Sequence, residues 1–389
     1  MSVGPAPDEQ PAASASAPTA IVRAKDPRII EPIQHRACCE CKPLRATYCF
    51  SLMRLGPGLI LATLISVCAS ADEPQTPHVL RFAAVIPQGT VWAREMQTFA
   101  RDVANTTDGQ VTLKWYLGGI AGDDVEAGKR IERDQLDGVG AGSWQCERWA
   151  PSVMVTRLPG LFRNREELKY VATRLRPTFE EEFRKAGFVH LGDAQVGGSI
   201  VFLRKPVHTF AELEHVRLWS LDIDAVKTRL LSAVGLTIVP MSFDQSRAAY
   251  DSGRVDGFSA PPTGALAFQW STQARYALPL ATDYIWACLV VSTRAFDRLT
   301  FEQQRAVRAA AAKFMTRFDE AGAQVDDELL HGLFARQGVT MLPVDDKLRA
   351  DYAAAAHAVW DKLDERTIPI PKTLIRQVQA MLTVYRASH

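Results

Sequence analysis

One predicted strand in the stretch from residue 206 to residue 261 carries a single basic residue among apolar and aromatic ones. This residue is Arg217, in the predicted strand VRLWS. A guanidinium group is planar and presents a fork of N–H donors, so it can bind a carboxylate through two parallel hydrogen bonds. Anion binding is therefore the chemistry available at Arg217. The alternative is that Arg217 is a surface residue of its strand.

The same stretch predicts the elements that would position this side chain. After the strand at Arg217 come a helix, a second strand (LTIVPM, 236–241), a second helix (FDQSRAAYDSG, 243–253) and a third strand that opens on VDGFSAPP. This order predicts two βαβ crossovers. Because ligands bind outside the carboxyl ends of parallel strands, residues 217–219, 240–243 and 258–261 should face one cleft.

Aromatic residues gather at the segments expected near that cleft. A single aromatic residue is more often part of a core than of a binding site. Several at strand ends favour a pocket with aromatic walls. The residues concerned are Trp144, Trp149, Trp219, Phe243, Phe258 and Trp270.

The rest of the chain also alternates predicted strands and helices, which is typical of an α/β fold with parallel sheets. Strands are predicted at 78–87, 111–117, 136–143, 188–198, 199–207, 274–280 and 283–293. Helices are predicted at 92–106, 123–135, 166–174, 177–186, 263–270, 299–338, 345–365 and 372–386, and Thr300 with Gln303 forms a capping box at the longest of them.

This pattern predicts two lobes joined by crossing strands, an arrangement that places a small-molecule site between them. We assign 72–198 and about 280–295 to lobe 1 and 199–279 to lobe 2. Residues 299–338 form a long spanning helix, and 339–389 form a C-terminal strand and helices that pack on the lobes.

The N-terminal region is expected to be absent from the mature protein. The short apolar run after Met53 and Arg54 is followed by the small–x–small tripeptide ending at Ala71, which predicts a cleaved signal peptide and a periplasmic protein. An alternative is lipidation of Cys68. Met53 resembles a true start, in which case residues 1–52 are not translated, and peptides from that region in cells would contradict this.

Composition and motifs exclude several classes of protein. Charge is balanced, with 45 Lys and Arg against 44 Asp and Glu, and no basic block supports nucleic-acid binding. The Gly-rich segment 117–124 lacks phosphate-loop spacing. No catalytic motif favours an enzyme, and no cofactor or metal site is predicted. The cysteines of the mature chain, Cys146 and Cys288, could pair or remain buried thiols. The others lie in the leader: Cys38, Cys39, Cys41, Cys49 and Cys68.

Several of these segments resemble the solute-binding proteins of TRAP (tripartite ATP-independent periplasmic) transporters, DctP type, over residues 78–365. The segments are DGQVTLKWYLGGIAGDD, LPGLFRN, KPVHTFAELEHVRLWS, VGLTIVPMSFDQSRAAYDSGRVDGFSAPP and FDRLTFEQQRAVRAAA. The resemblance implies a two-lobe periplasmic binding protein fold with parallel-rich sheets and a long lobe-spanning helix. It also implies capture of a small organic acid and delivery to TRAP permease subunits in the membrane, without enzymatic activity.

The resemblance assigns Arg217 to the ligand carboxylate. Ala260 and Gln245 stand where the family has polar residues, so the cleft is expected to be less polar than is usual, with Ser259 as a replacement donor. We therefore predict a monocarboxylate ligand with an apolar or aromatic body. The other candidate contacts are Gln88, Trp144, Trp149, Trp219, Phe243, Phe258 and Trp270.

Two questions stay open at this point. The receptor serves a transporter or, alternatively, a sensor kinase or chemoreceptor. The protein is a monomer or a dimer, since the helix at 372–386 fits either a dimer contact or a cap on one lobe.

Overall fold

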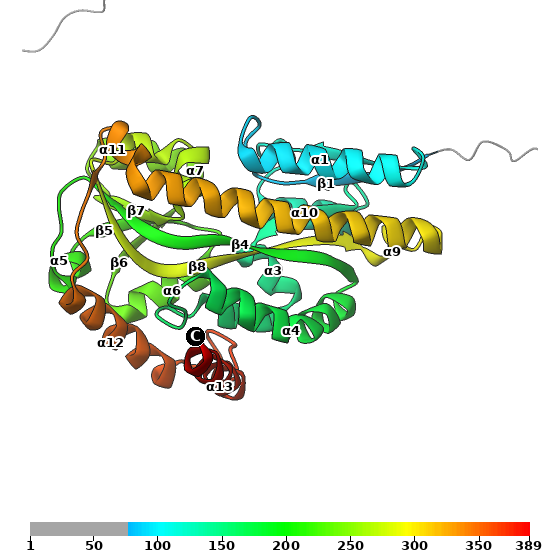
Figure 1. Ribbon diagram of the computed structural model, residues 1–389. Coiled ribbons are helices and arrows are strands. Elements are labelled where there is room, and N and C mark those ends of the chain that lie inside the picture. The colour runs from blue at the N-terminus through cyan, green and yellow to red at the C-terminus, as the bar shows by residue number, and fades with distance from the viewer. Residues whose placement is uncertain (1–76) are drawn as a thin grey trace, which may run out of the picture. The chain divides into compact units, whose positions relative to one another are not determined.

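The computed structural model describes residues 77–389 (Figure 1). The predicted signal peptide, the cleavage after Ala71 and the alternative lipidation of Cys68 lie outside the described residues.

Nine strands of the described region form one sheet, in the order β2-β1-β3-β8-β4-β7-β5-β6, with β9 beside β8. The strands of the two lobes therefore lie at opposite ends of a continuous sheet rather than in separate sheets. Their bounds are β1 His78–Ala83, β2 Val111–Tyr116, β3 Gly138–Gly142, β4 Phe188–Leu203, β5 Arg217–Leu221, β6 Thr237–Met241, β7 Gly257–Ala260, β8 Tyr276–Ser292 and β9 Thr340–Met341.

The first lobe is built on β1, which pairs in parallel with both β2 and β3. Helix α1 (Val91–Thr106) connects β1 to β2, and α2 (Asp124–Glu132) connects β2 to β3. Each helix starts at a polar cap: the side chain of Thr90 accepts a hydrogen bond from the backbone of Ala93, and that of Asp123 from the backbone of Glu126. The next elements are α3 (Ser143–Trp149) and the 3-10 helix η1 (Pro151–Arg157).

The second lobe contains the two predicted βαβ crossovers. Strand β5 pairs in parallel with β6 and β7, and helices α6 (Ala225–Val234) and α7 (Phe243–Asp251) connect them. The elements predicted from residues 206–261 are thus all present, in the predicted order. Smaller helices flank this unit: α5 (Phe210–Glu214), α8 (Pro262–Ala267) and η2 (Trp270–Gln273).

The crossing strands β4 and β8 join the lobes as an antiparallel pair. The sequence predicted two strands for each of them, but each is one continuous strand. Bulges between His190 and Gly192, Gln195 and Gly197, and Ser199 and Val201 shift the register instead of breaking the strand. A bulge bends a strand without ending it, which explains how one pair of strands serves both lobes.

Helix α10 (Phe301–Glu328) runs over the crossing strands and along both lobes (Figure 1). The predicted capping box of Thr300 and Gln303 is present at its start. The prediction extended this helix to residue 338. The α-helix instead ends at Glu328 and passes into a wider turn, η3 (Leu329–Leu333), where Gly332 has a φ of 139°. A short helix, α11 (Phe334–Arg336), follows.

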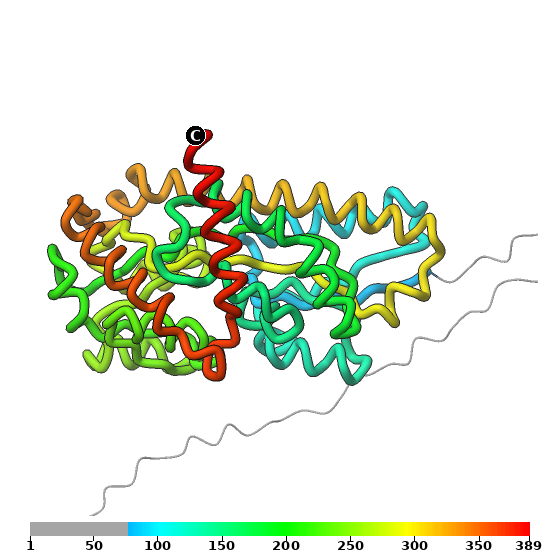
Figure 2. The backbone as a smooth tube through the Cα atoms, turned by 90° about the horizontal axis from the view of Figure 1, so that it is seen from below, coloured from blue at the N-terminus to red at the C-terminus, as the bar shows by residue number. Residues whose placement is uncertain are grey.

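The opposite face of the sheet is covered by α4, α6, α12 and α13 (Figure 1). Helix α4 (Arg165–Lys185) was predicted as two helices separated at Pro177, but it continues through this proline. Its buried residues extend on both sides of the proline, from Leu168 to Phe183, so packing outweighs the lost hydrogen bond. Figure 2 shows α13 (Lys372–Ser388) crossing this face next to α12 (Asp346–Lys362). A four-residue helix, α9 (Thr293–Phe296), links β8 to α10.

Candidate functional site

A cavity of about 480 Å³ lies between the two lobes, beneath α10. The ends of β3, β5 and β7, the residues before α7 and the middle of β8 surround it. It is therefore at the carboxyl ends of the parallel strands, where the sequence predicted a cleft.

Aromatic side chains form much of the cavity wall. In the second lobe, the ring of Trp270 lies 4.8 Å from that of Trp219 and 5.4 Å from that of Phe243. Trp144 belongs to the wall of the first lobe, and Phe314 and Phe318 of α10 close the space between the lobes. The cavity thus brings together five of the predicted contact residues: Trp144, Trp219, Phe243, Ser259 and Trp270.

Three other predicted contacts do not line this cavity. Phe258 stacks on Phe202 at 4.8 Å, inside the core behind Trp219. Trp149 packs on Phe188 at 4.2 Å in another core cluster. Gln88 is exposed in the loop between β1 and α1. In these cases the residue type was compatible with a site, but the chain directs the side chain into the interior or into solvent.

Arg217 also lies outside the cavity, which differs from its predicted role. It is the first residue of β5, whereas the cavity is reached at Trp219–Leu221, and a strand advances about 3.3 Å per residue. Its side chain is 46% exposed and its guanidinium binds both carboxylate oxygens of Asp256, at 2.7 and 2.9 Å. The fork chemistry is present, and within the protein its partner is Asp256.

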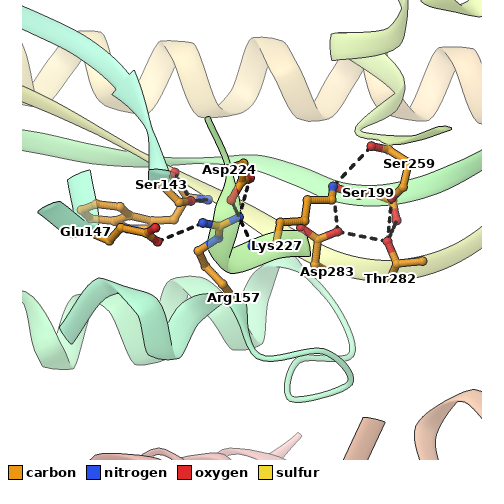
Figure 3. Close-up of polar contacts among 10 residues, drawn as sticks. Ser143, Glu147, Arg157, Ser199, Asp224, Lys227, Ser259, Thr282 and Asp283 are labelled. Atoms are coloured by element: carbon orange, nitrogen blue, oxygen red, sulfur yellow. Dashed lines mark hydrogen bonds and ion pairs between the residues drawn. The ribbon is translucent and has the colours of Figure 1, made fainter. Parts of the chain in front are cut away.

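Lys227 is the only Lys or Arg among the described residues that line the cavity. It lies on α6, is 7% exposed, and its ammonium group is 3.1 Å from Asp283 Oδ1 (Figure 3). It also donates to Ser199 Oγ and to the backbone oxygen of Ser259, both at 3.3 Å. The sequence analysis missed Lys227. Its signal was a single cation three residues after the helix-capping Asp224.

A second buried ion network connects the lobes next to Lys227. Arg157 of η1 donates to both oxygens of Asp224, at 2.7 and 2.6 Å, and to Glu147 Oε2 at 2.9 Å (Figure 3). Burial alone would lower the pKa of Arg157, but the two carboxylates outweigh burial and raise the pKa. Asp224 caps α6 in the second lobe, whereas Arg157 and Glu147 belong to the first. The network therefore links the two lobes at the cavity floor, which is the part of the wall formed by Asp224 and Lys227.

Four aspartates of residues 206–261 lie in or near the cavity but have different surroundings. Asp224 binds Arg157, Asp256 binds Arg217, and Asp222 and Asp244 lie on the cavity wall. Across residues 77–389, no three His, Cys, Asp or Glu side chains come together in an arrangement that could hold a metal ion.

Cys146 and Cys288 form a disulfide, which resolves the two alternatives left by the sequence. It links α3 to the crossing strand β8, and Cys288 itself lines the cavity. The bridge therefore fixes the first-lobe wall that carries Trp144 to the strand that continues into the second lobe.

None of the helices formed by residues 77–389 is both long and apolar enough to span a membrane.

Solved structures share this fold. A TRAP periplasmic solute-binding protein from Haemophilus influenzae with bound L-gulonate matches with a TM-score of 0.71 and 14% identity, over 78% of this chain and 99% of its own. A sugar acid-binding protein from Advenella mimigardefordensis in complex with galactonate gives 0.71 and 18%, over 79% and 98%. An extracytoplasmic solute receptor from Bordetella pertussis binding pyroglutamic acid gives 0.69 and 17%, over 78% and 99%.

The sequence itself has curated relatives. A solute-binding protein from Chromohalobacter salexigens is 22% identical over 330 residues, which cover 83% of this chain and 93% of the relative. Residues 82–367 match the family of bacterial extracellular solute-binding proteins, family 7. This match covers most of the two lobes and the long helix that frames the cavity. The chain therefore belongs to the DctP family of bacterial extracellular solute-binding proteins, the solute receptors of TRAP transporters.

Proposed function

We propose that this protein captures a small monocarboxylic acid with an apolar or aromatic body and delivers it to a TRAP-type permease from the periplasm. The observation that carries this proposal is the cavity between the lobes, with aromatic walls and, among residues 77–389, a single lining cation, Lys227. Small-molecule sites are usually concave, largely apolar and equipped with few polar groups.

Lys227 is the best candidate to bind the ligand carboxylate. Its contacts with Ser199 and Ser259 are long, at 3.3 Å, so an incoming carboxylate can replace them while Asp283 stays bound. The related structures hold gulonate, galactonate and pyroglutamic acid, which are all acids. A sugar acid would need several hydroxyl partners. Asp224, Lys227 and Ser259 already bind other groups of the protein, and the carboxylates of Asp222 and Asp244 belong to exposed residues of the wall. This favours a less polar acid.

A thermal-shift and calorimetry panel tests the ligand class. We expect aromatic monocarboxylates such as 3-phenylpropanoate to stabilise the protein, and gulonate and succinate to bind at least about tenfold more weakly, because they leave polar groups unpaired in an apolar cavity. Tight binding of gulonate without binding of any aromatic acid would overturn the ligand class. Absence of binding by every acid would overturn the receptor function itself.

Lys227→Met should weaken acid binding by about thirtyfold or more, since a buried charge partner is lost. Lys227→Arg keeps the charge and should retain most of the affinity. The double variant Lys227→Met/Asp283→Asn removes both charges, so it separates loss of the ligand contact from the burial of an unpaired Asp283. The role of Lys227 is wrong if this double variant binds acids as well as the wild type does.

A further inference from the structure

One buried carboxyl group in the described part of the chain differs from the rest. Asp124 is 1% exposed and lines the cavity at the start of α2. Every other buried acid between residues 77 and 389 forms an ion pair with Lys or Arg, but Asp124 forms none. The paired acids are Asp137, Glu147, Glu167, Asp224, Asp283 and Asp326.

Only one oxygen of Asp124 has a hydrogen-bond partner among the described residues. Oδ2 accepts from the backbone N–H of Gly142 at 3.1 Å, whereas Oδ1 is buried without a partner. Unpaired buried polar atoms are rare in folded proteins because each of them lowers stability. An unpaired atom of this kind beside a cavity gains a hydrogen bond when a ligand group reaches it.

A second polar atom without a partner lies beside it. Trp144 Nε1 is buried and has no partner at full hydrogen-bond geometry within the described residues, but its N–H is close enough to Asp124 to lower the pKa of that carboxyl group. The ring of Trp144 lies against Gly142, so closely that a Cβ atom at position 142 would be 2.4 Å from it. Gly142 thus holds Asp124 through its N–H and leaves space for Trp144, and both side chains belong to the same wall of the cavity.

No cation on the surrounding elements balances Asp124. Strand β3 has no charged residue. On α3, Glu147 binds Arg157 and Arg148 is exposed. The other charged groups near Asp124 belong to two places. On α2 and its ends they are Asp123, Glu132, and Glu126 paired with Lys129, Arg130 and Arg133. On the facing wall they are Asp222, Asp244 and the pair of Lys227 with Asp283.

Burial without a cation raises the pKa of Asp124 to about 7, although the Gly142 N–H and Trp144 oppose this effect. A ligand that excludes the remaining water would favour the neutral acid further. The protonated carboxyl then presents an O–H donor, next to the N–H donor of Trp144.

We infer that protonated Asp124 and Trp144 together donate hydrogen bonds to a carbonyl oxygen of the ligand, at the first-lobe end of the cavity. The ligand is then an oxo or amido acid, with its carboxylate toward Lys227 and its carbonyl group toward Asp124. This inference rests on the proposed function, because it takes the cavity as the acid-binding site. It adds a specificity determinant that recognises an uncharged part of the ligand.

Matched pairs of acids test this inference in the full protein by calorimetry. Phenylpyruvate and 3-phenylpropanoate differ by one carbonyl group, as do 3-benzoylpropanoate and 4-phenylbutanoate. At pH 6 we expect at least one oxo acid to bind about tenfold or more tightly than its partner, because a site built for a hydrogen bond rejects a ligand that lacks it. Above pH 7 this advantage should fall about tenfold per pH unit, because the bound complex holds one proton that the free protein has lost.

Variants separate the two donors from a structural effect. Asp124→Asn retains an N–H donor at this position, so it should keep the preference for the oxo acid and lose the pH dependence. Asp124→Leu and Trp144→Phe should each lower the preference for the oxo acid several-fold, measured as the ratio of the two Kd values within each matched pair. Glu132→Gln removes a negative charge from an exposed position of the same helix, outside the cavity, and should leave the pH dependence unchanged.

The outcomes distinguish this inference from the proposed function. Equal binding of both members of each pair overturns the inference while the receptor function stands. The inference is also overturned if binding of the oxo acid strengthens with rising pH or is abolished by Asp124→Asn. In that case the ionised carboxylate of Asp124 would be accepting a hydrogen bond rather than donating one. If no acid of the panel binds at all, both are overturned.

Discussion

Buried charged groups on two sides of the same cavity differ in whether they have an ion-pair partner. At the floor, Arg157 binds Asp224 and Glu147, and Lys227 binds Asp283, so each charge has a partner within the protein. On the first-lobe wall, Asp124 has no cation as a partner within residues 77–389 and accepts a hydrogen bond from the Gly142 N–H. Paired charges hold the lobes in one arrangement, whereas an unpaired group keeps its hydrogen-bonding capacity for another molecule. The difference separates the network of Arg157, which stabilises the fold, from Asp124, and from Lys227, whose long contacts with Ser199 and Ser259 a ligand can replace.

The largest effect should come from breaking the network at the floor. Arg157→Met leaves two buried carboxylates without a cation and should lower the free energy of unfolding by about 3–5 kcal/mol. Urea denaturation measures this. The matched control is Arg247→Met, which removes the exposed pair with Asp251 and should have little effect. An equal loss in both variants would show that the network at the floor does not stabilise the fold.

An intermediate effect is expected from the unpaired acid. The pKa of Asp124 is about 7 in the folded protein, above its ordinary value of 3.8. The folded protein therefore keeps a proton that the unfolded chain releases, and stability falls as the pH rises from about 4 to about 7. The stabilisation lost over this range is on the order of 3 kcal/mol.

The measurement is the difference between wild type and Asp124→Asn over that pH range, because other acids also titrate. For example, the pKa values of Asp137 and Glu167 are lowered, so their contribution to stability is lost in acid rather than toward neutral pH. A wild type and variant with the same dependence on pH would contradict the raised pKa of Asp124.

The smallest effect should come from Arg217. Because its guanidinium binds Asp256 outside the cavity, Arg217→Gln should change the Kd for an acid ligand by less than a factor of about two, as is usual for surface positions. Titration of both proteins with the same acid tests this. A loss of about thirtyfold, like that expected for Lys227→Met, would restore the role first predicted for Arg217.

The second lobe shows which structural features a sequence pattern can predict. The alternating strands and helices of residues 206–261 are local features, and all appeared where they were predicted. Ligand sites lie at the carboxyl ends of parallel strands. Trp219, Phe243 and Ser259 are in or just after the carboxyl-terminal parts of their strands, and all of them line the cavity. The same rule does not favour Arg217, because it lies at the other end of its strand. The ligand-binding role of Arg217 therefore stays a prediction, which the titration of Arg217→Gln tests.

Other residues could not be located from the sequence by such rules. Phe258 and Trp149 have the residue type of a binding wall, but their side chains pack in cores formed by distant segments. Asp124 stands next to Asp123 in the sequence, and nothing local distinguishes the buried residue from the exposed one. Their environments depend on which elements pack against α2.

The sequence alone determined the class of the protein: an α/β chain with two βαβ crossovers, crossing strands, a capped long helix and the segments of a solute receptor. These properties depend on local patterns and on their order. Only the tertiary structure decided which polar groups face the cavity, because ion pairs such as Arg157 with Asp224, or Lys227 with Asp283, join residues far apart in the chain. Packing decides whether a buried carboxyl group has a cation beside it. Asp124 has none among the described residues, so its carboxyl group keeps hydrogen-bonding capacity for a ligand.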